Sequence, residues 1–345
     1  MNKGQTKSFH QRHRTGTVCL VLAMLTAVSL LAAGCKSTRL PDFLNPKPTA
    51  TSLAKHAIKN VQNVQSAEVK ADIDTEIGAS VSIISLSMDM NMDLDMEMTK
   101  DPLLSKGQAD VEVGMMGKNQ TMHGDFYLDG TDDTTYIRWK DGEWTKKTAD
   151  KTEQAQNGEG SAGLIPSIPG TGNGDLDETI AQSVSILQLI ADGAVETELK
   201  EETVTVQEKE AWQINATVQG PLLKEILSST GKVSDSDLEK IHWEEVEIPA
   251  EIYIYKNTEL PARIVMDCKS FGPSLLSADS LEGIDALNEQ IPVGEIELEL
   301  KKCDIDLVFD RYDEIEPFEI PQEVKNAKEA DSLSPDVMEM LEDAF

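Results

Sequence analysis

The chain has 345 residues, of which 31 are Lys or Arg and 62 are Asp or Glu, so its formal net charge at pH 7 is −31. This excess of acidic residues argues against nucleic acid as a partner, because phosphate binding requires a basic surface. Hydrophobic residues make up 39% of the chain and there are 22 glycines, which argues against a disordered chain and for a folded core.

The first 34 residues have the layout of a secretory signal peptide. Basic residues precede an uncharged apolar run from Val18 to Ala33, which at about 16 residues is short for a permanent membrane span. The run ends in Gly34-Cys35, which resembles the lipobox of bacterial lipoproteins, where the cysteine is diacylated and becomes the mature N-terminus. We therefore expect residues 1–34 to be removed and Cys35 to be lipidated. The alternative is an ordinary signal peptide with an incidental cysteine.

Lipidation at Cys35 predicts anchoring at the extracytoplasmic face of the cell membrane through a diacylglyceryl-cysteine. Two acyl chains, such as palmitate, give stable anchoring at about 0.8 kcal/mol per buried CH₂, whereas one chain binds reversibly. Residues 35–50 contain three prolines and are expected to form a tether.

Two cysteines remain in the expected mature domain besides the lipidated one. Cys268 and Cys303 each lie in a strand-like run, and outside the cytoplasm they can form a disulfide if the two strands are neighbours. Free thiols and a disulfide are equally compatible with the sequence. The mature histidines, His56, His123 and His242, are far apart, so no metal site is predicted.

Residues 51–325 are predicted to form one domain that is rich in strands. The apolar spacing from Thr51 predicts a helix, which Thr51 or Ser52 would cap. From Glu68 to Met98 the apolar period changes to two, which is typical of strands. Further strands are expected at 109–115, 121–128, 134–139 and 143–147, with a turn at Asp141-Gly142 between the last two.

The second half of this domain begins with a change of composition. Residues 150–177 are dominated by Gly, Ser, Thr, Asn and Pro, and we expect a flexible insert there. The pattern then predicts helices at 180–193, 221–231 and 234–241, and strands at 196–207, 211–218, 247–256, 261–270 and 294–309. Residues 274–288 fit a weak helix or a loop, and 326–345 are expected to be a C-terminal tail, either frayed or with a short helix from Ser334.

Several of these features together resemble a known superfamily. They are the N-terminal helix, the long alternating strands, the turn Asp141-Gly142-Glu143-Trp144, and the closing phrases Tyr312-Asp313-Glu314-Ile315 and Ile320-Pro321. Residues 50–325 resemble the LolA/LolB and LppX/LprG lipoproteins, and most of all an uncharacterised Gram-positive family with Met-Asp-rich strands. The resemblance implies an α+β fold in which helices cover the concave face of one strongly curved antiparallel sheet, a half-barrel. It also implies a lipid or acyl chain between sheet and helices, and it carries over no catalytic residues.

One predicted strand has an unusual pattern of side chains. Its apolar positions form a methionine stripe, which consists of Met88, Met90, Met92, Leu94, Met96 and Met98. The stripe either packs in the core or lines a ligand cavity, since flexible thioethers adapt to varied apolar ligands.

The alternate positions of this strand carry Asp89, Asn91, Asp93, Asp95 and Glu97. Their spacing superficially matches a calcium-binding EF-hand loop, but Leu94 stands where Gly is required and Lys100 where Glu is required. We therefore expect a solvated face, with weak surface Ca²⁺ association as the alternative.

The sequence motifs give little support to an enzymatic function. Gly158–Gly163 matches a dinucleotide fingerprint, but no strand precedes it, and Pro166 and Pro169 prevent the following helix. No catalytic residue and no cofactor is predicted. Trp139 and Trp144 flank a turn, where they either pack across strands or contact a ligand or membrane.

The sequence therefore predicts a monomeric, membrane-anchored extracytoplasmic lipoprotein that binds a lipid or another hydrophobic ligand without catalysis. The alternative is a cell-envelope interaction or sensor lipoprotein with a solid core and an acidic face that binds a partner.

Overall fold

The computed structural model describes residues 47–81, 84–115, 118–148, 186–230, 239, 242–271 and 296–330. Several segments that the sequence analysis predicted are the signal peptide, the lipidated cysteine, most of the tether, the insert at 150–177, most of the helix at 234–241, residues 274–288 and the tail from 331. They lie outside the described residues. Of the helix predicted at 180–193, residues 186–192 are described and are helical.

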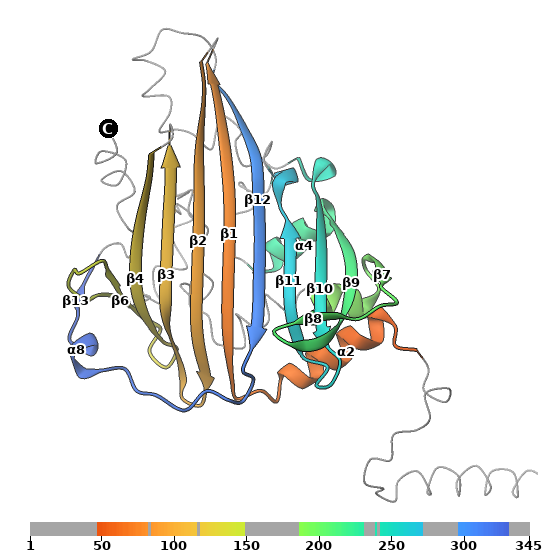
Figure 1. The fold of residues 1–345 in the computed structure, drawn as a ribbon, viewed down its shortest axis with the longest axis horizontal. Helices are drawn as coiled ribbons and strands as arrows, with labels where there is room; N and C mark the ends of the chain where they lie inside the picture. The colour runs from red at the N-terminus through yellow and green to blue at the C-terminus, as the bar shows by residue number, and fades with distance from the viewer. Residues whose placement is uncertain are drawn as a thin grey trace, which may run out of the picture. The chain divides into compact units, whose positions relative to one another are not determined.

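The described chain is built mainly from strands, with a few helices (Figure 1). The strands are β1 (Ser66–Val81), β2 (Ile84–Lys100), β3 (Leu103–Met115), β4 (Lys118–Asp129), β5 (Thr134–Trp139), β6 (Thr145–Thr148), β7 (Glu196–Leu199), β8 (Val204–Val206), β9 (Lys209–Gln219), β10 (Glu247–Tyr255), β11 (Pro261–Asp267), β12 (Ile296–Asp310) and β13 (Lys328–Glu329). The α-helices are α2 (Ala50–Val61), α4 (Gly220–Thr230) and α8 (Gln322–Lys325), and the 3₁₀ helices are η3 (Trp243–Glu245) and η4 (Lys269–Phe271).

All the strands belong to one sheet of 13 strands, in the order β13-β6-β5-β4-β3-β2-β1-β12-β11-β10-β9-β7, with β8 also pairing with β9. The sheet is open, since its end strands β13 and β7 are not paired with each other. The prediction of a purely antiparallel sheet is wrong, because β13 pairs with β6 in parallel. The chain after β12 returns to this edge, where Ala330 N–H donates to the Lys146 carbonyl over 2.9 Å.

The first helix starts earlier than its apolar spacing suggests. Thr49 caps α2, so the prediction of Thr51 or Ser52 as the cap is wrong. Ser52 N–H donates to Thr49 Oγ1 over 3.1 Å, and Thr49 N–H donates to Ser52 Oγ over 2.9 Å. This reciprocal capping box gives hydrogen-bond partners to the N–H groups of Thr49 and Ser52. The first N–H groups of a helix have no partner within the helix itself.

The long alternating run is extended, as its period predicts, and the structure divides it into two strands that pair with each other. β1 and β2 pair along their whole length, from Ser66 opposite Thr99 to Val81 opposite Ile84. On β2, Leu94 and Met96 are buried whereas Asp93 and Asp95 are exposed, so the two faces of the sheet differ as expected.

The strand predicted at 196–207 is interrupted in the structure. β7 and β8 both pair with β9, and residues 200–203 separate them. The interruption contains Lys200 and Glu201-Glu202, whose side chains leave no apolar position to continue the alternation.

The main core lies between the sheet and two helices. Leu53, Ala54 and Ala57 of α2 and Leu187 and Ile190 of the 186–192 helix belong to the same buried cluster. This cluster also contains residues of β1–β5 and β9–β12. Figure 1 shows α2 and α4 on one side of strands β9–β11. Within the part of the chain that is described, no helix is long and apolar enough to cross a membrane.

Candidate functional site

The methionine stripe lies on the face of the sheet that packs against the helices. Its half nearest the end of β2 is fully enclosed, since Leu94, Met96 and Met98 are at most 3% exposed and share a cluster with α2 and residues 186–192. These three side chains therefore belong to the helix–sheet core.

The other half of the stripe lies in a separate cluster. Met90 and Met92 are buried together with Ile73, Val111, Val113 and Met122, and half-buried Met88 packs against them. Among the residues that the structure describes, the six buried members of this cluster all belong to strands β1–β4. We call these six residues and Met88 the strand-only apolar patch.

The two cysteines are brought together beside this patch. Cys268 directly follows β11, and its N–H donates to the carbonyl of Cys303 on β12 over 2.7 Å. Cys303 is paired with Thr75 on β1, and Thr75 is paired with Met90 on β2. Both cysteines are half-buried free thiols. The structure therefore meets the condition of neighbouring strands, and the disulfide itself stays a prediction.

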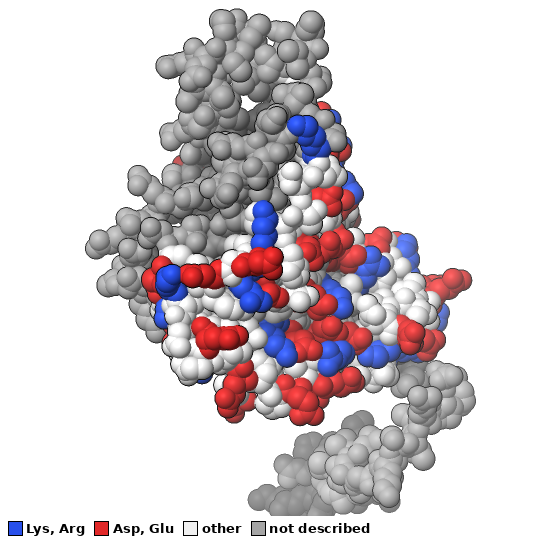
Figure 2. Space-filling model, turned by 60° about the vertical axis from the view of Figure 1, so that its left-hand side comes forward, with Lys and Arg blue, Asp and Glu red and all other residues white. Residues whose placement is uncertain are grey.

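The opposite face of the sheet carries an acidic row. Asp306, Asp72, Asp93 and Asp110 lie in register on the neighbouring strands β12, β1, β2 and β3. They line a hollow of about 330 Å³. Burial, followed by the negative charges of Asp93, Asp74 and Asp306, raises the pKa of Asp72 above its ordinary value. In Figure 2, acidic side chains cover much of the described surface in view, with basic side chains set among them.

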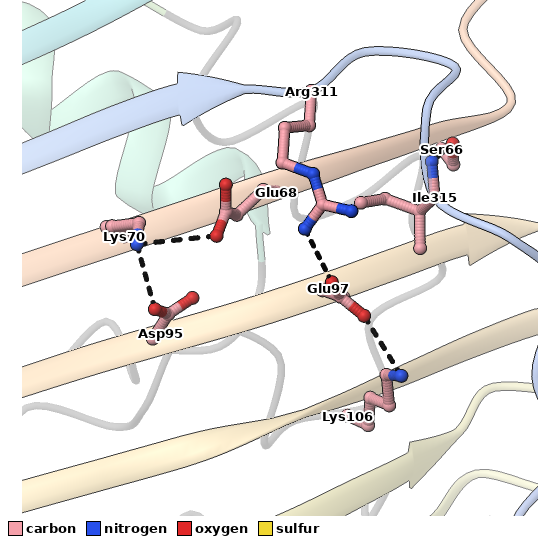
Figure 3. Close-up of polar contacts among 8 residues, drawn as sticks. All are labelled: Ser66, Glu68, Lys70, Asp95, Glu97, Lys106, Arg311 and Ile315. Carbon is pink, nitrogen blue, oxygen red and sulfur yellow. Dashed lines mark hydrogen bonds and ion pairs between the residues drawn. The ribbon is translucent and has the colours of Figure 1, made fainter. Parts of the chain in front are cut away.

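A network of paired charges lies beside the acidic row (Figure 3). Glu97 accepts hydrogen bonds from Lys106 Nζ at 3.0 Å and from Arg311 Nη1 at 2.7 Å. Both bonds lower the pKa of Glu97, and the bond from Lys106 has the larger effect. Lys70 contacts Asp95 at 2.9 Å and Glu68 at 3.3 Å. The network lines one part of a second hollow, of about 370 Å³.

Arg311 reaches this network because the segment after β12 is tied to the start of β1. Ile315 N–H donates to Ser66 Oγ over 3.1 Å, and Asp313 N–H donates to the Ser66 carbonyl over 2.8 Å. Sequence reasoning missed Arg311, because nothing in the local pattern indicates that residues 311–315 cross the ends of β1 and β2.

The two tryptophans of the predicted turn lie on different faces. Trp139 packs against both apolar clusters, and its ring lies so close to Gly124 that a Cβ there would come within 2.6 Å of it. Trp144 lies at the second hollow, where the Arg138 guanidinium stands 4.9 Å from its ring and the Tyr127 ring 5.6 Å away. Both rings therefore pack against residues of neighbouring strands, and Trp144 also lines the second hollow.

The polar face offers oxygen ligands without a recognisable metal centre. Among the residues that the structure places, no group of three or more His, Cys, Asp or Glu side chains is arranged to hold a metal ion. The predicted lipidation site Cys35 lies outside those residues.

Comparisons with known families give a partial match. Residues 49–163 match a family of unknown function, DUF6612. This range contains α2, strands β1–β6 and the whole methionine stripe. No curated protein matches the sequence.

Similarity to solved structures is low in sequence and in superposition. The MucA/MucB complex of Pseudomonas aeruginosa gives 8% identity and a TM-score of 0.19, with 74% of this chain and 56% of that chain covered. A DUF1329 family protein from Desulfovibrio piger gives 10% identity and 0.21, with 76% and 93% covered. A LolA superfamily protein from Nitrosomonas europaea gives 10% identity and 0.18, with 76% and 92% covered.

The chain thus spans little more than half of the length of the chain it matches in the MucA/MucB structure. TM-scores of this size do not define a shared fold, and the architecture described above rests on the strand pairing of this chain alone.

Proposed function

We propose that this protein is a lipoprotein anchored through Cys35 to the extracytoplasmic face of the cell membrane. In this proposal residues 1–34 are the signal peptide and residues 35–50 the tether. The sheet is a LolA-like half-barrel whose concave face is covered by helices. A lipid or another hydrophobic ligand binds between sheet and helices, and no reaction is catalysed.

The observation that carries the proposal is the strand-only apolar patch. It continues the apolar face of β1–β4 beyond the side chains that contact α2 and residues 186–192. The six side chains other than Met88 are themselves at most 9% exposed, so a ligand must be thin and apolar enough to enter at the half-buried Met88 edge. An acyl chain fits this requirement, since each Å² of apolar surface removed from water contributes about 25 cal/mol.

The side chains of the patch suit a ligand of variable shape. Met88, Met90, Met92 and Met122 have unbranched, polarizable thioethers, which adapt their rotamers to different apolar partners. Ligand sites of this kind are mostly apolar and need few polar groups. Two polar side chains share this face with the patch, since buried Thr75 and half-buried Cys303 lie in the same row as Met90.

The test is binding of a fatty acid that carries an environment-sensitive fluorophore. The full chain, extracted from membranes with detergent and freed of co-purified lipid, should bind the probe saturably. Met88→Lys places a charge at the half-buried edge of the patch and should weaken binding at least tenfold. Asn91→Lys makes the same charge change on the opposite face of β2 and should leave binding unchanged.

Absence of lipid in mass spectra of the extracted protein, together with no saturable uptake of the probe, would overturn the proposal. Equal weakening by Met88→Lys and Asn91→Lys would also count against it. Circular dichroism of both variants excludes loss of the fold as the cause.

A second function, that of an interaction or sensor lipoprotein, is favoured by a different observation. Four aspartates of neighbouring strands line one hollow on the polar face. A basic partner would then bind this face while the interior stays filled with side chains. In that case Asp93→Asn combined with Asp110→Asn should abolish retention of the partner, and Met88→Lys should not affect it.

A further inference from the structure

The cysteine pair lies across two neighbouring strands, at the end of their hydrogen-bonded ladder. Asp267 opposite Asp304 is the last registered pair of β11 and β12, and Cys268 and Cys303 follow directly. The short bond from Cys268 N–H to the Cys303 carbonyl continues the ladder by one residue. Residues directly opposite each other in antiparallel strands have Cα atoms about 4.5 to 5.5 Å apart, within the span that a disulfide bridges.

The two thiols differ in how firmly they hold their protons. Hydrogen bonds donated by the Cys268 thiol and by the Thr75 hydroxyl lower the pKa of Cys303. The same bond to Cys303, followed by burial, raises the pKa of Cys268. Thr75 on β1 is paired directly with Cys303 and is buried, so its hydroxyl is placed to stabilise the Cys303 thiolate, which is the reactive form.

We propose that Cys268 and Cys303 are a modification site at which a disulfide forms across β11 and β12 by thiol–disulfide exchange, with Cys303 as the attacking residue. The oxidant is a disulfide of another molecule, either a small disulfide or a disulfide oxidoreductase.

The exchange balances in two steps. The Cys303 thiolate attacks one sulfur of the oxidant, which forms a mixed disulfide and breaks the oxidant's S–S bond, releasing its other sulfur as a thiolate. Cys268 then loses its proton to solvent or to that thiolate, and its sulfur attacks the Cys303 sulfur. The second oxidant thiolate leaves, so that two electrons pass from the cysteine pair to the oxidant and two protons are released.

The position of the bond determines its effect on the molecule. It would tie the end of β11 to β12 on the face that carries Thr75 and Met90. It would close a loop of about 35 residues, which restricts the unfolded chain and should raise the melting temperature by about 5 to 10 °C. This inference does not depend on the proposed ligand, because the oxidation is measured without one.

The first experiment maps the bond in the full chain. The protein is reduced, then incubated with oxidised glutathione at pH 8, alkylated and digested. Mass spectrometry should find the Cys268 and Cys303 peptides joined, and the joined form should melt at the higher temperature. If both residues remain fully alkylated, or each carries its own glutathione, the proposal is overturned.

A second experiment tests the role of Cys303. In Cys268→Ser the serine hydroxyl can still donate to Cys303, so glutathione should add to Cys303 at least tenfold faster than to Cys268 in Cys303→Ser. Removing the other donor, as Thr75→Val, should slow the reaction of Cys303 in the Cys268→Ser background. Equal rates in the two single variants would overturn the assignment of Cys303 as the attacking residue. Urea unfolding of each variant verifies that the fold is retained.

Discussion

Glu97 on β2 is the point where three parts of the chain meet on the polar face. Its carboxylate is 25% exposed and holds Lys106 of β3 and Arg311, which follows β12. Paired charges at such partly buried positions contribute more to stability than fully exposed pairs, because solvent screens them less. The network therefore joins the segment after β12 to the middle of the sheet.

We predict that Glu97→Gln lowers the free energy of unfolding by about 1 kcal/mol at pH 7, because two cations lose their charged partner. The pKa of Glu97 is lowered in the folded state, so its contribution is complete above its ordinary value of 4.5 and is lost as the pH falls through the folded pKa. Urea unfolding at a series of pH values from 7 downward should show the difference shrinking below pH 4.5.

Glu112→Gln is a matched control for this change. Glu112 accepts a hydrogen bond from the neutral amide of Asn119 at 2.7 Å. The control should cost less than Glu97→Gln at pH 7. Equal costs would mean that the two cations add nothing to stability.

Asp72 is predicted to behave in the opposite way. Its pKa is raised in the folded state by burial and by neighbouring carboxylates, so the charged form destabilises the fold. Asp72→Asn should raise the free energy of unfolding at pH 7 by about 0.5 kcal/mol. Below its ordinary pKa of 3.8 the gain should vanish, because the carboxyl is then protonated in both states, and it should grow as the pH rises through the folded pKa.

Urea unfolding of Asp72→Asn from pH 3 to pH 7 measures this trend. Asp101→Asn, in the exposed turn after β2, removes the same charge away from the acidic row. A loss of stability in Asp72→Asn at pH 7 would show that the row is held by attractive contacts instead.

At the scale of the element, the apolar face of β2 lies in two different environments along its length. Met96 is 0% exposed in the core under the helices, whereas Met88 is half-buried at the edge of the strand-only apolar patch. The alternation of the sequence predicts that both side chains point to the same face. It does not predict how deeply each is buried, since that depends on where α2 and residues 186–192 pack.

We predict that Met96→Ala lowers the free energy of unfolding by about 3 kcal/mol and Met88→Ala by less than about 1 kcal/mol, because only the first leaves an enclosed cavity. Chemical unfolding of the two variants tests this directly. Similar losses in both would indicate that the stripe is packed uniformly and would weaken the case for a ligand at its Met88 end.

At the scale of the whole molecule, the proposed anchor makes a prediction about location. Cys35→Ser should move the protein from the membrane to the soluble fraction and abolish the mass of the acyl chains, because serine has no sulfur to carry the diacylglyceryl group. Cys19→Ser should behave as the wild type, since Cys19 lies within the predicted signal peptide. Fractionation and mass spectrometry of the mature N-terminus measure both, and membrane retention of Cys35→Ser would contradict the anchor.

How far the fold followed from sequence differs between neighbouring strands. The strand character of residues 68–98 was predicted, because apolar residues recur there with a period of two. The division of this run into the paired strands β1 and β2 was not predicted, because the alternation does not mark where one strand ends. The pairing of β1 with β12 was not predicted either, since alternation does not identify which distant strand lies alongside. For the same reason, the sequence did not predict the parallel pairing of β13 with β6.

The candidate site, too, was predictable from the sequence only in part. The methionine stripe and its acidic alternates were visible in the sequence, because residues that share a strand face are two positions apart. The acidic row across four strands was not visible, because it depends on the register of β12, β1, β2 and β3.

The sequence by itself determined the negative charge, the long strands and the chemistry of their two faces, because each depends on side chains that are close along the chain. Only the tertiary structure decided that Cys268 lies beside Cys303 and that Arg311 reaches Glu97, 214 positions away. The physical reason is that these contacts follow from the order and register of strands, which are set by packing of the whole sheet and not by local alternation.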